Sequence, residues 1–161
     1  MRAWKLGATT LLVVLAALAL GACGESAPSA SSTGSSDVVV LEPSEFSVAG
    51  YEGKPLVVNF FGSWCGPCNA EAPDLAAFAT ANPDVQFVGI AVGDTEEQAI
   101  GFMNQYGLSY PVVIDDNSLS SAWGISGVPT TIFFTSTGEE ADRIVGAADR
   151  DQFEQSLAKA Q

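Results

Sequence analysis

The chain has 161 residues, 47% of them hydrophobic, which is enough for one sizeable core. It carries 19 Asp and Glu residues against 6 Lys and Arg residues, a formal net charge of −13. This balance excludes nucleic-acid binding, because such binding depends on cationic contacts to phosphates. The chain has no His and three Cys, so a zinc site with four Cys or His ligands is excluded as well.

The first 22 residues have the pattern of an export signal. Arg2 and Lys5 make the start of the chain positive, and an apolar run follows from residue 6 to residue 20. This run fits the core of a signal peptide and is short for a membrane-spanning helix, which needs roughly 20 apolar residues. We therefore expect residues 1–22 to be a targeting segment that takes no part in the fold.

The stretch Leu20-Gly21-Ala22-Cys23 resembles the lipobox of bacterial lipoproteins. The resemblance implies cleavage after Ala22, a diacylglycerol thioether on Cys23, and a lipid-anchored protein on the extracytoplasmic side of the bacterial cell membrane. Lipidation also accounts for the one cysteine that stands apart from the other two. An uncleaved signal anchor and a secreted protein with a free Cys23 thiol are the alternatives.

Residues 23–37 are expected to form a flexible linker after the lipidated cysteine. Ser, Ala, Gly, Thr and Pro dominate residues 25–36, so the segment has too little apolar surface to offset the entropy cost of ordering. A dozen such residues span about 20 Å as a random coil. Beyond the signal, four basic residues stand against nineteen acidic ones, a net charge of −15. This charge disfavours docking on anionic lipid and leaves the acyl chains as the membrane contact.

Residues 38–161 have the length of a single domain, expected to be a monomer, in which strands and helices alternate. In chain order the pattern predicts an edge strand at 38–41, a turn at 50–54, a buried strand at 56–61, a helix at 69–80, a buried strand at 85–92, a helix from Thr95 to Gly107, a short strand at 112–114, a helical turn at 119–123, a hairpin of strands at 130–135 and 141–145, and a final helix from Asp149. This order predicts an α/β fold whose central mixed sheet is covered by helices on both faces.

The stretch Trp64-Cys65-Gly66-Pro67-Cys68 lies between a predicted buried strand and a predicted helix. Two cysteines at this spacing can close a small disulfide ring, and a helix N-terminus favours a thiolate because its backbone N–H groups are unpaired. Pro67 suits the first helical turn, where its missing N–H costs nothing. Beside a βαβ unit, the pattern predicts a thiol-exchange site; an inert structural disulfide is the alternative.

Three stretches together make the chain resemble the TlpA/ResA-like, membrane-tethered thiol–disulfide oxidoreductases of the thioredoxin superfamily. They are residues 58–68 with the two cysteines, Glu71-Ala72-Pro73, and Gly127-Val128-Pro129-Thr130. The resemblance covers nearly all of residues 38–161. It implies a thioredoxin-like fold with an inserted α/β element between Val92 and Pro111, and an enzyme that needs no cofactor beyond its dithiol.

The resemblance also assigns roles to the residues around the motif. Cys65 would be the exposed, attacking thiolate, and Cys68 the shielded, resolving thiol. Trp64 would cover the site, with core packing as its alternative. Val128 and Pro129 would form a cis-proline loop whose backbone pairs with an extended substrate; the alternative is a trans Pro129 that merely begins a strand.

Proton handling is expected to differ from that of cytosolic thioredoxin. Asn59 occupies the strand position where cytosolic thioredoxin has a buried Asp, and an amide cannot act as a base. Glu71 lies three residues beyond Cys68, at the offset of a Glu in the membrane-tethered relatives. We hypothesise that Glu71 accepts the proton of Cys68. The alternative is a solvated first-turn carboxylate favoured by the helix dipole.

The expected function follows from the same resemblance. It implies an extracytoplasmic enzyme that reduces disulfides of exported proteins, apocytochrome c among them, and that is kept reduced by a membrane-embedded thiol electron carrier. The dipeptide Gly66-Pro67 resembles that of reducing thioredoxins. The main alternative is a disulfide-forming oxidase for envelope protein folding; a thiol peroxidase and a copper chaperone are weaker alternatives.

Overall fold

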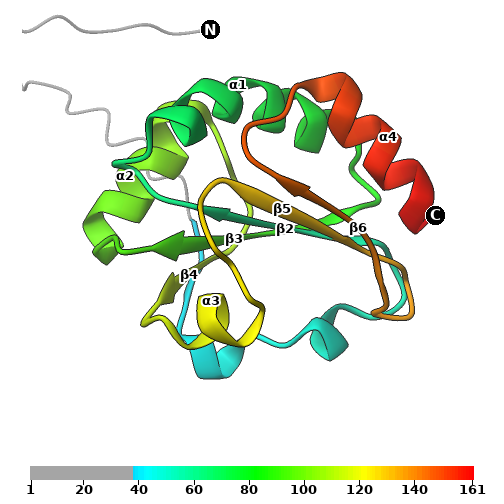
Figure 1. Ribbon diagram of the computed structural model, residues 1–161, viewed down its shortest axis with the longest axis horizontal. Coiled ribbons are helices and arrows are strands. Elements are labelled where there is room, and N and C mark those ends of the chain that lie inside the picture. The colour runs from blue at the N-terminus through cyan, green and yellow to red at the C-terminus, as the bar shows by residue number, and fades with distance from the viewer. Residues whose placement is uncertain (1–37) are drawn as a thin grey trace, which may run out of the picture. The chain divides into compact units, whose positions relative to one another are not determined.

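Within residues 38–161, which the computed structural model describes, six strands form one mixed β-sheet (Figure 1). The expected signal peptide over residues 1–22, the lipidated Cys23 and the linker to residue 37 lie outside the described residues. The strands are β1 (Val40–Leu41), β2 (Leu56–Phe61), β3 (Gln86–Val92), β4 (Val112–Asp115), β5 (Thr130–Phe134) and β6 (Glu140–Val145). Their order across the sheet is β1-β4-β3-β2-β5-β6; the first four are parallel, and β5 and β6 are antiparallel to their neighbours.

Helices cover both faces of this sheet, which confirms the predicted α/β class (Figure 1). Helices α1 (Gly66–Ala81), α2 (Glu96–Tyr106) and α4 (Arg150–Ala160) pack on one face. The short helix α3 (Ser118–Ala122) and the 3-10 helices η1 (Pro43–Glu45) and η2 (Val48–Tyr51) lie on the other. The sequence pattern predicts only a turn at 50–54 in the region of η1 and η2. Among the helices of residues 38–161, none is long and apolar enough to cross a membrane.

Strand β2 is buried along its whole length, because both faces of the sheet are covered. Its side chains alternate between two cores: Val57 and Phe61 pack with α1, α2 and α4, whereas Val58 and Phe60 pack on the α3 side. Asn59, the one polar residue of the strand, lies between Val57 and Phe61 and therefore faces α1. The central strand thus carries one amide into an otherwise apolar layer.

Local capping signals in the sequence fix the ends of α2 and α4 as predicted. Thr95 caps α2, and its side chain and that of Gln98 satisfy each other's backbone N–H groups. Gly107 ends α2 in the left-handed conformation, with φ of 69°. Asp149 and Gln152 form the same reciprocal cap at the start of α4. These three helix boundaries are therefore decided by residues close to them in sequence.

The sheet topology brings the cysteine motif and the proline loop together at one end of the neighbouring strands β2 and β5. β2 ends at Phe61, just before the motif, and the antiparallel strand β5 begins at Thr130, just after Pro129. Phe60 and Thr130 are register partners, so the end of one strand lies beside the beginning of the other. Segments more than 60 residues apart in sequence therefore meet at the N-terminus of α1.

Candidate active site

Cys65 and Cys68 form a disulfide at the first turn of α1, with their Cα atoms 5.2 Å apart. Helix α1 begins at Gly66, three residues before the predicted start, because Cys65 itself occupies the N-cap position. The backbone N–H of Cys68 donates to Cys65 Sγ over 3.1 Å. An N–H donor and the helix N-terminus both favour negative charge on that sulfur once the bond is reduced.

The expectation that Cys65 is exposed is wrong for this oxidised state. Cys65 is 4% exposed and Cys68 1% exposed. The physical reason is the Val128–Pro129 loop, whose Val128 carbonyl oxygen lies 3.5 Å from Cys65 Sγ. A disulfide sulfur carries no hydrogen, so this approach is a contact and not a hydrogen bond. The Val128–Pro129 peptide bond is cis, which excludes the trans alternative.

Trp64 lies on the surface beside the disulfide, so its alternative role in core packing is wrong. Its side chain is 64% exposed, and its Nε1–H donates to the Val92 carbonyl over 3.0 Å. The indole lies close over Gly62, where a Cβ atom would come within 2.6 Å of Nε1. The absence of a side chain at Gly62 therefore lets the indole lie close to the backbone at the end of β2.

Trp64 and the cis-proline loop form the two sides of a groove of about 310 Å³, which we name the Trp64 groove. Its walls include Trp64, Val92, Asn117, Ser120, Ser121 and Val128. The groove lies next to the disulfide, because both Trp64 and Val128 adjoin Cys65. The groove is open to solvent.

Glu71 is buried beneath the first turns of α1, and the alternative of a solvated carboxylate is wrong. It is 3% exposed. Its Oε1 accepts from Asn59 Nδ2 over 3.0 Å, and its Oε2 accepts from the backbone N–H of Ala148 over 3.1 Å. Burial raises the pKa of Glu71 to about 7, although these hydrogen bonds from Ala148 and Asn59 oppose the rise. Near neutral pH the group therefore exists in both protonation states.

Asn59 joins Glu71 to the sheet. The Nδ2 group of Asn59 also donates to Thr131 Oγ1 over 2.9 Å, and Asn59 and Thr131 are register partners on β2 and β5. Glu71 lies one helical turn beyond Cys68, and residues three apart on a helix face the same side. Both are buried, so the carboxyl group and the second sulfur lie on the same side of α1 and have little contact with bulk water.

Sequence reasoning missed the residues that brace the motif. Asp94, which follows β3, accepts from both the backbone N–H and the hydroxyl of Ser63 over 2.7 Å. Asn69 donates to the carbonyls of Ser63 and Cys65, and Tyr106 of α2 donates to Asn69. Asp94 lies at the carboxyl end of a strand parallel to β2, and this position could have indicated its contact with the motif. The sequence holds no comparable signal for Asn69 and Tyr106.

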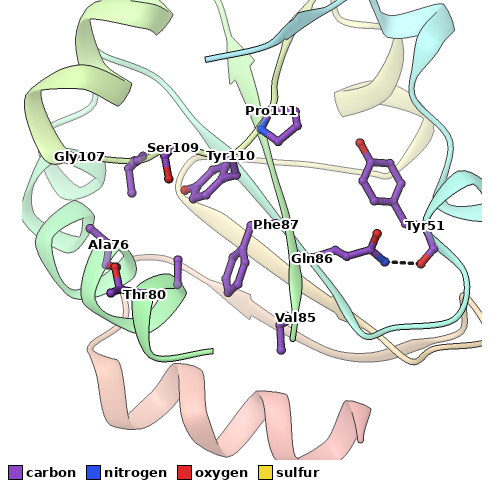
Figure 2. A pocket seen from close by; sticks show the side chains of 12 residues that line it. Tyr51, Ala76, Thr80, Val85, Gln86, Phe87, Gly107, Ser109, Tyr110 and Pro111 are labelled. Carbon is purple, nitrogen blue, oxygen red and sulfur yellow. Dashed lines mark hydrogen bonds between the residues drawn. The ribbon is translucent and has the colours of Figure 1, made fainter. Parts of the chain in front are cut away.

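A second cavity, of about 330 Å³, lies away from the disulfide, between α1 and the loop before β4 (Figure 2). The rings of Phe87 and Tyr110 and the side chain of Thr80 line it (Figure 2). No cysteine and no charged residue lies in its wall, so it does not take part in the thiol chemistry. Elsewhere in the described part of the chain, no three Cys, His, Asp or Glu residues are grouped to hold a metal ion.

Comparison with known proteins agrees with this site. Residues 22–160 match the model of the Redoxin family. Thiol-disulfide oxidoreductase ResA of Bacillus anthracis is 29% identical over 125 residues, which is 76% of this chain and 72% of the relative. Thiol:disulfide interchange protein HelX of Rhodobacter capsulatus is 34% identical over 102 residues, 62% of this chain and 57% of the relative.

Solved structures show the same likeness. A secreted disulfide oxidoreductase of Mycobacterium tuberculosis, described as homologous to DsbE of E. coli, superposes with a TM-score of 0.64 at 31% identity, over 70% of this chain and 87% of its own. DsbF of the same organism gives a TM-score of 0.65 at 28% identity, over 70% and 84%.

Glu71→Gln is expected to flatten the pH dependence of stability in the oxidised protein. A carboxyl group whose pKa is raised by folding stabilises the native state fully below its ordinary pKa of 4.5, and this contribution is lost as the pH rises through about 7. Between pH 5 and 8, the free energy of unfolding of the wild type should fall by roughly 2–3 kcal/mol more than that of the variant.

Urea unfolding at a series of pH values measures this difference. Glu139→Gln removes an exposed carboxyl group and serves as the control, with a curve parallel to that of the wild type. If Glu71→Gln also runs parallel to the wild type, burial does not raise the pKa of Glu71.

Proposed function

We propose that this chain, which belongs to the Redoxin family and is a ResA-like thiol–disulfide oxidoreductase with a thioredoxin-like fold, reduces disulfides of exported proteins outside the cytoplasm. The observation that carries the proposal is the Cys65–Cys68 disulfide at the N-terminus of α1, one turn from a buried Glu71 whose pKa is about 7. This combination provides a nucleophile, a resolving thiol and a proton acceptor in one place.

The proposed reaction has two exchange steps. The Cys65 thiolate attacks one sulfur of the client disulfide, the client's other sulfur leaves as a thiolate, and a mixed disulfide with Cys65 forms. Cys68 then attacks Cys65 Sγ, which releases the client's second thiol and closes the Cys65–Cys68 bond. The client gains two electrons, and the enzyme dithiol loses two. A thiol donor must then return two electrons to the enzyme.

Glu71 is proposed to accept the proton of Cys68 in the second step. Cys68 is 1% exposed and Glu71 3% exposed, so water is a poor acceptor at this point. A base is most effective when its pKa lies near the working pH, and that of Glu71 is about 7. Asn59 and the Ala148 N–H hold the carboxyl group in place for this transfer.

The reducing direction is supported by the dipeptide Gly66-Pro67 between the cysteines. Thioredoxin, a reductant, has a potential of about −270 mV, whereas the oxidant DsbA lies near −120 mV. We further propose that Cys23 anchors the monomeric protein to the cell membrane, with residues 23–37 as the linker, and that a membrane-embedded thiol carrier supplies electrons. Apocytochrome c is the client class that this scheme suggests first.

Replacing the resolving thiol tests the exchange mechanism. Cys68→Ala is expected to accumulate mixed disulfides through Cys65, because the second step is lost while the first remains. Non-reducing electrophoresis of envelope extracts, followed by mass spectrometry, identifies the trapped clients. Cys65→Ala is the matched control and should trap none. Equal trapping by both variants contradicts the assigned order of attack.

A measured reduction potential tests the direction. Equilibration with a glutathione buffer measures it. We expect a value well below that of glutathione, about −270 mV. A value near −120 mV would instead assign the protein to the disulfide-forming oxidases.

Removing the proton acceptor is expected to slow the release of the client. Glu71→Gln should lower the rate of the second step at pH 7 by about 10²-fold, the usual contribution of a general base, and should abolish the inflection of the rate near pH 7. Stopped-flow measurement of the step from mixed disulfide to product, from pH 5 to pH 9, gives both quantities. Glu139→Gln is the control, and a Glu71→Gln profile identical to the wild type would rule out the proton role.

A further inference from the structure

The described surface carries no unpaired cation. Of the 19 acidic residues of the chain, Glu25 and Asp37 precede residue 38, which leaves 17 acidic residues against four basic ones in residues 38–161. Each of the four basic side chains lies within 4 Å of a carboxylate, in the pairs Lys54–Asp84, Arg143–Glu140, Arg150–Glu154 and Lys159–Asp142. Residues 38–161 therefore present negative potential, with every Lys and Arg among them already paired.

No charged residue lines the Trp64 groove, but two carboxylates, Asp94 and Asp116, lie close in sequence to residues that line it. Asp94, two residues after the lining residue Val92, is 8% exposed and accepts two hydrogen bonds from Ser63, the neighbour of Trp64. Asp116 is exposed and directly precedes the lining residue Asn117. Asp116 accepts from the Ser118 N–H over 3.0 Å, which ties its carboxylate to the start of α3.

The exposed indole of Trp64 is suited to a cation. Its Nε1–H is bonded to the Val92 carbonyl, so the ring is fixed in orientation before any partner arrives. In residues 38–161 it is one of only three large hydrophobic side chains that are exposed. An aromatic face attracts a guanidinium or ammonium group within about 6 Å of its centre, and here the surrounding charges have the complementary sign.

We propose that the Trp64 groove selects client segments that carry Arg or Lys beside the reacting cysteine. The cationic side chain lies against the Trp64 indole and between the charges of Asp94 and Asp116, while the client cysteine faces Cys65. The inference rests on the proposed function and adds to it the chemical class of the client. It explains why the groove is lined by neutral side chains: a carboxylate within it would have to lose its water on every encounter, whereas flanking charges attract the client at a distance.

The test uses the full chain in its reduced form and three synthetic peptides. Each peptide contains one intramolecular disulfide between two cysteines and differs only in the residues that flank them: Arg, Gln or Glu. The measured quantity is the second-order rate constant of peptide reduction, divided by the rate constant of the same peptide with dithiothreitol. This division removes the effect of the flanking charge on the peptide disulfide itself.

At low ionic strength we expect the Arg peptide to react about tenfold faster than the Gln peptide, and the Glu peptide to be the slowest. The Arg-to-Glu ratio should shrink as salt is raised to 1 M, where the screening length falls to about 3 Å. Asp116→Asn should lower this ratio, since Asn keeps the acceptor for Ser118 and loses the charge. Asp151→Asn removes one exposed charge from α4, on the opposite face of the sheet, and should leave the ratio near that of the wild type.

Trp64→Leu separates the contribution of the indole from that of the surrounding carboxylates. It should remove the part of the Arg preference that survives at high salt. Equal normalised rates for the Arg and Glu peptides, with the Gln peptide still reduced, would overturn the inference and leave the proposed function intact. If Asp116→Asn and Asp151→Asn lower the Arg-to-Glu ratio equally, the client's cationic side chain does not bind at the Trp64 groove. Failure to reduce even the Gln peptide would overturn the proposed function, and this inference with it.

Discussion

A carboxyl group closed off from water beneath the redox motif is the constraint on which the site depends. Glu71 accepts two hydrogen bonds, one from Asn59 on β2 and one from the backbone at Ala148. Those donors favour the charged form, and burial favours the neutral form more strongly. The balance places the proton equilibrium of Glu71 near neutral pH, where the proposed exchange step requires Cys68 to lose a proton. A carboxylate in open solvent would have given up its proton far below that range.

The fold holds the two hydrogen-bond donors of Glu71 in place. Asn59 is fixed by Thr131 on the neighbouring strand, and the loop before α4 supplies the second donor. The same sheet edge holds the cis-proline loop over Cys65 and fixes the motif from the other side through Asp94 and Ser63. The proposed proton transfer below the disulfide and the proposed client contact above it therefore depend on the same few strands.

Local patterns in the sequence predict most of the helices and strands and the redox role of the two cysteines. Helix caps, buried strands and the cysteine motif each depend on residues that are close together in sequence. The environment of the site could not be predicted in this way. The burial of Cys65 depends on the Val128 carbonyl, 63 residues away, and the state of Glu71 depends on the Ala148 amide, 77 residues away. The expectation of an exposed Cys65 was wrong for this reason, whereas the family resemblance indicated Glu71 through its offset alone.

Titration of the Glu71 carboxyl group measures directly whether burial raises its pKa to near neutrality. Selective carbon-13 labelling of Glu carboxyl groups allows its resonance to be followed with pH in the oxidised protein, and its absence in Glu71→Gln assigns the signal. If burial sets the protonation of Glu71, the midpoint lies near 7, well above the ordinary value of 4.5. A midpoint near 4.5 would show that water or an unrecognised cation stabilises the charge, and the proton role would be contradicted.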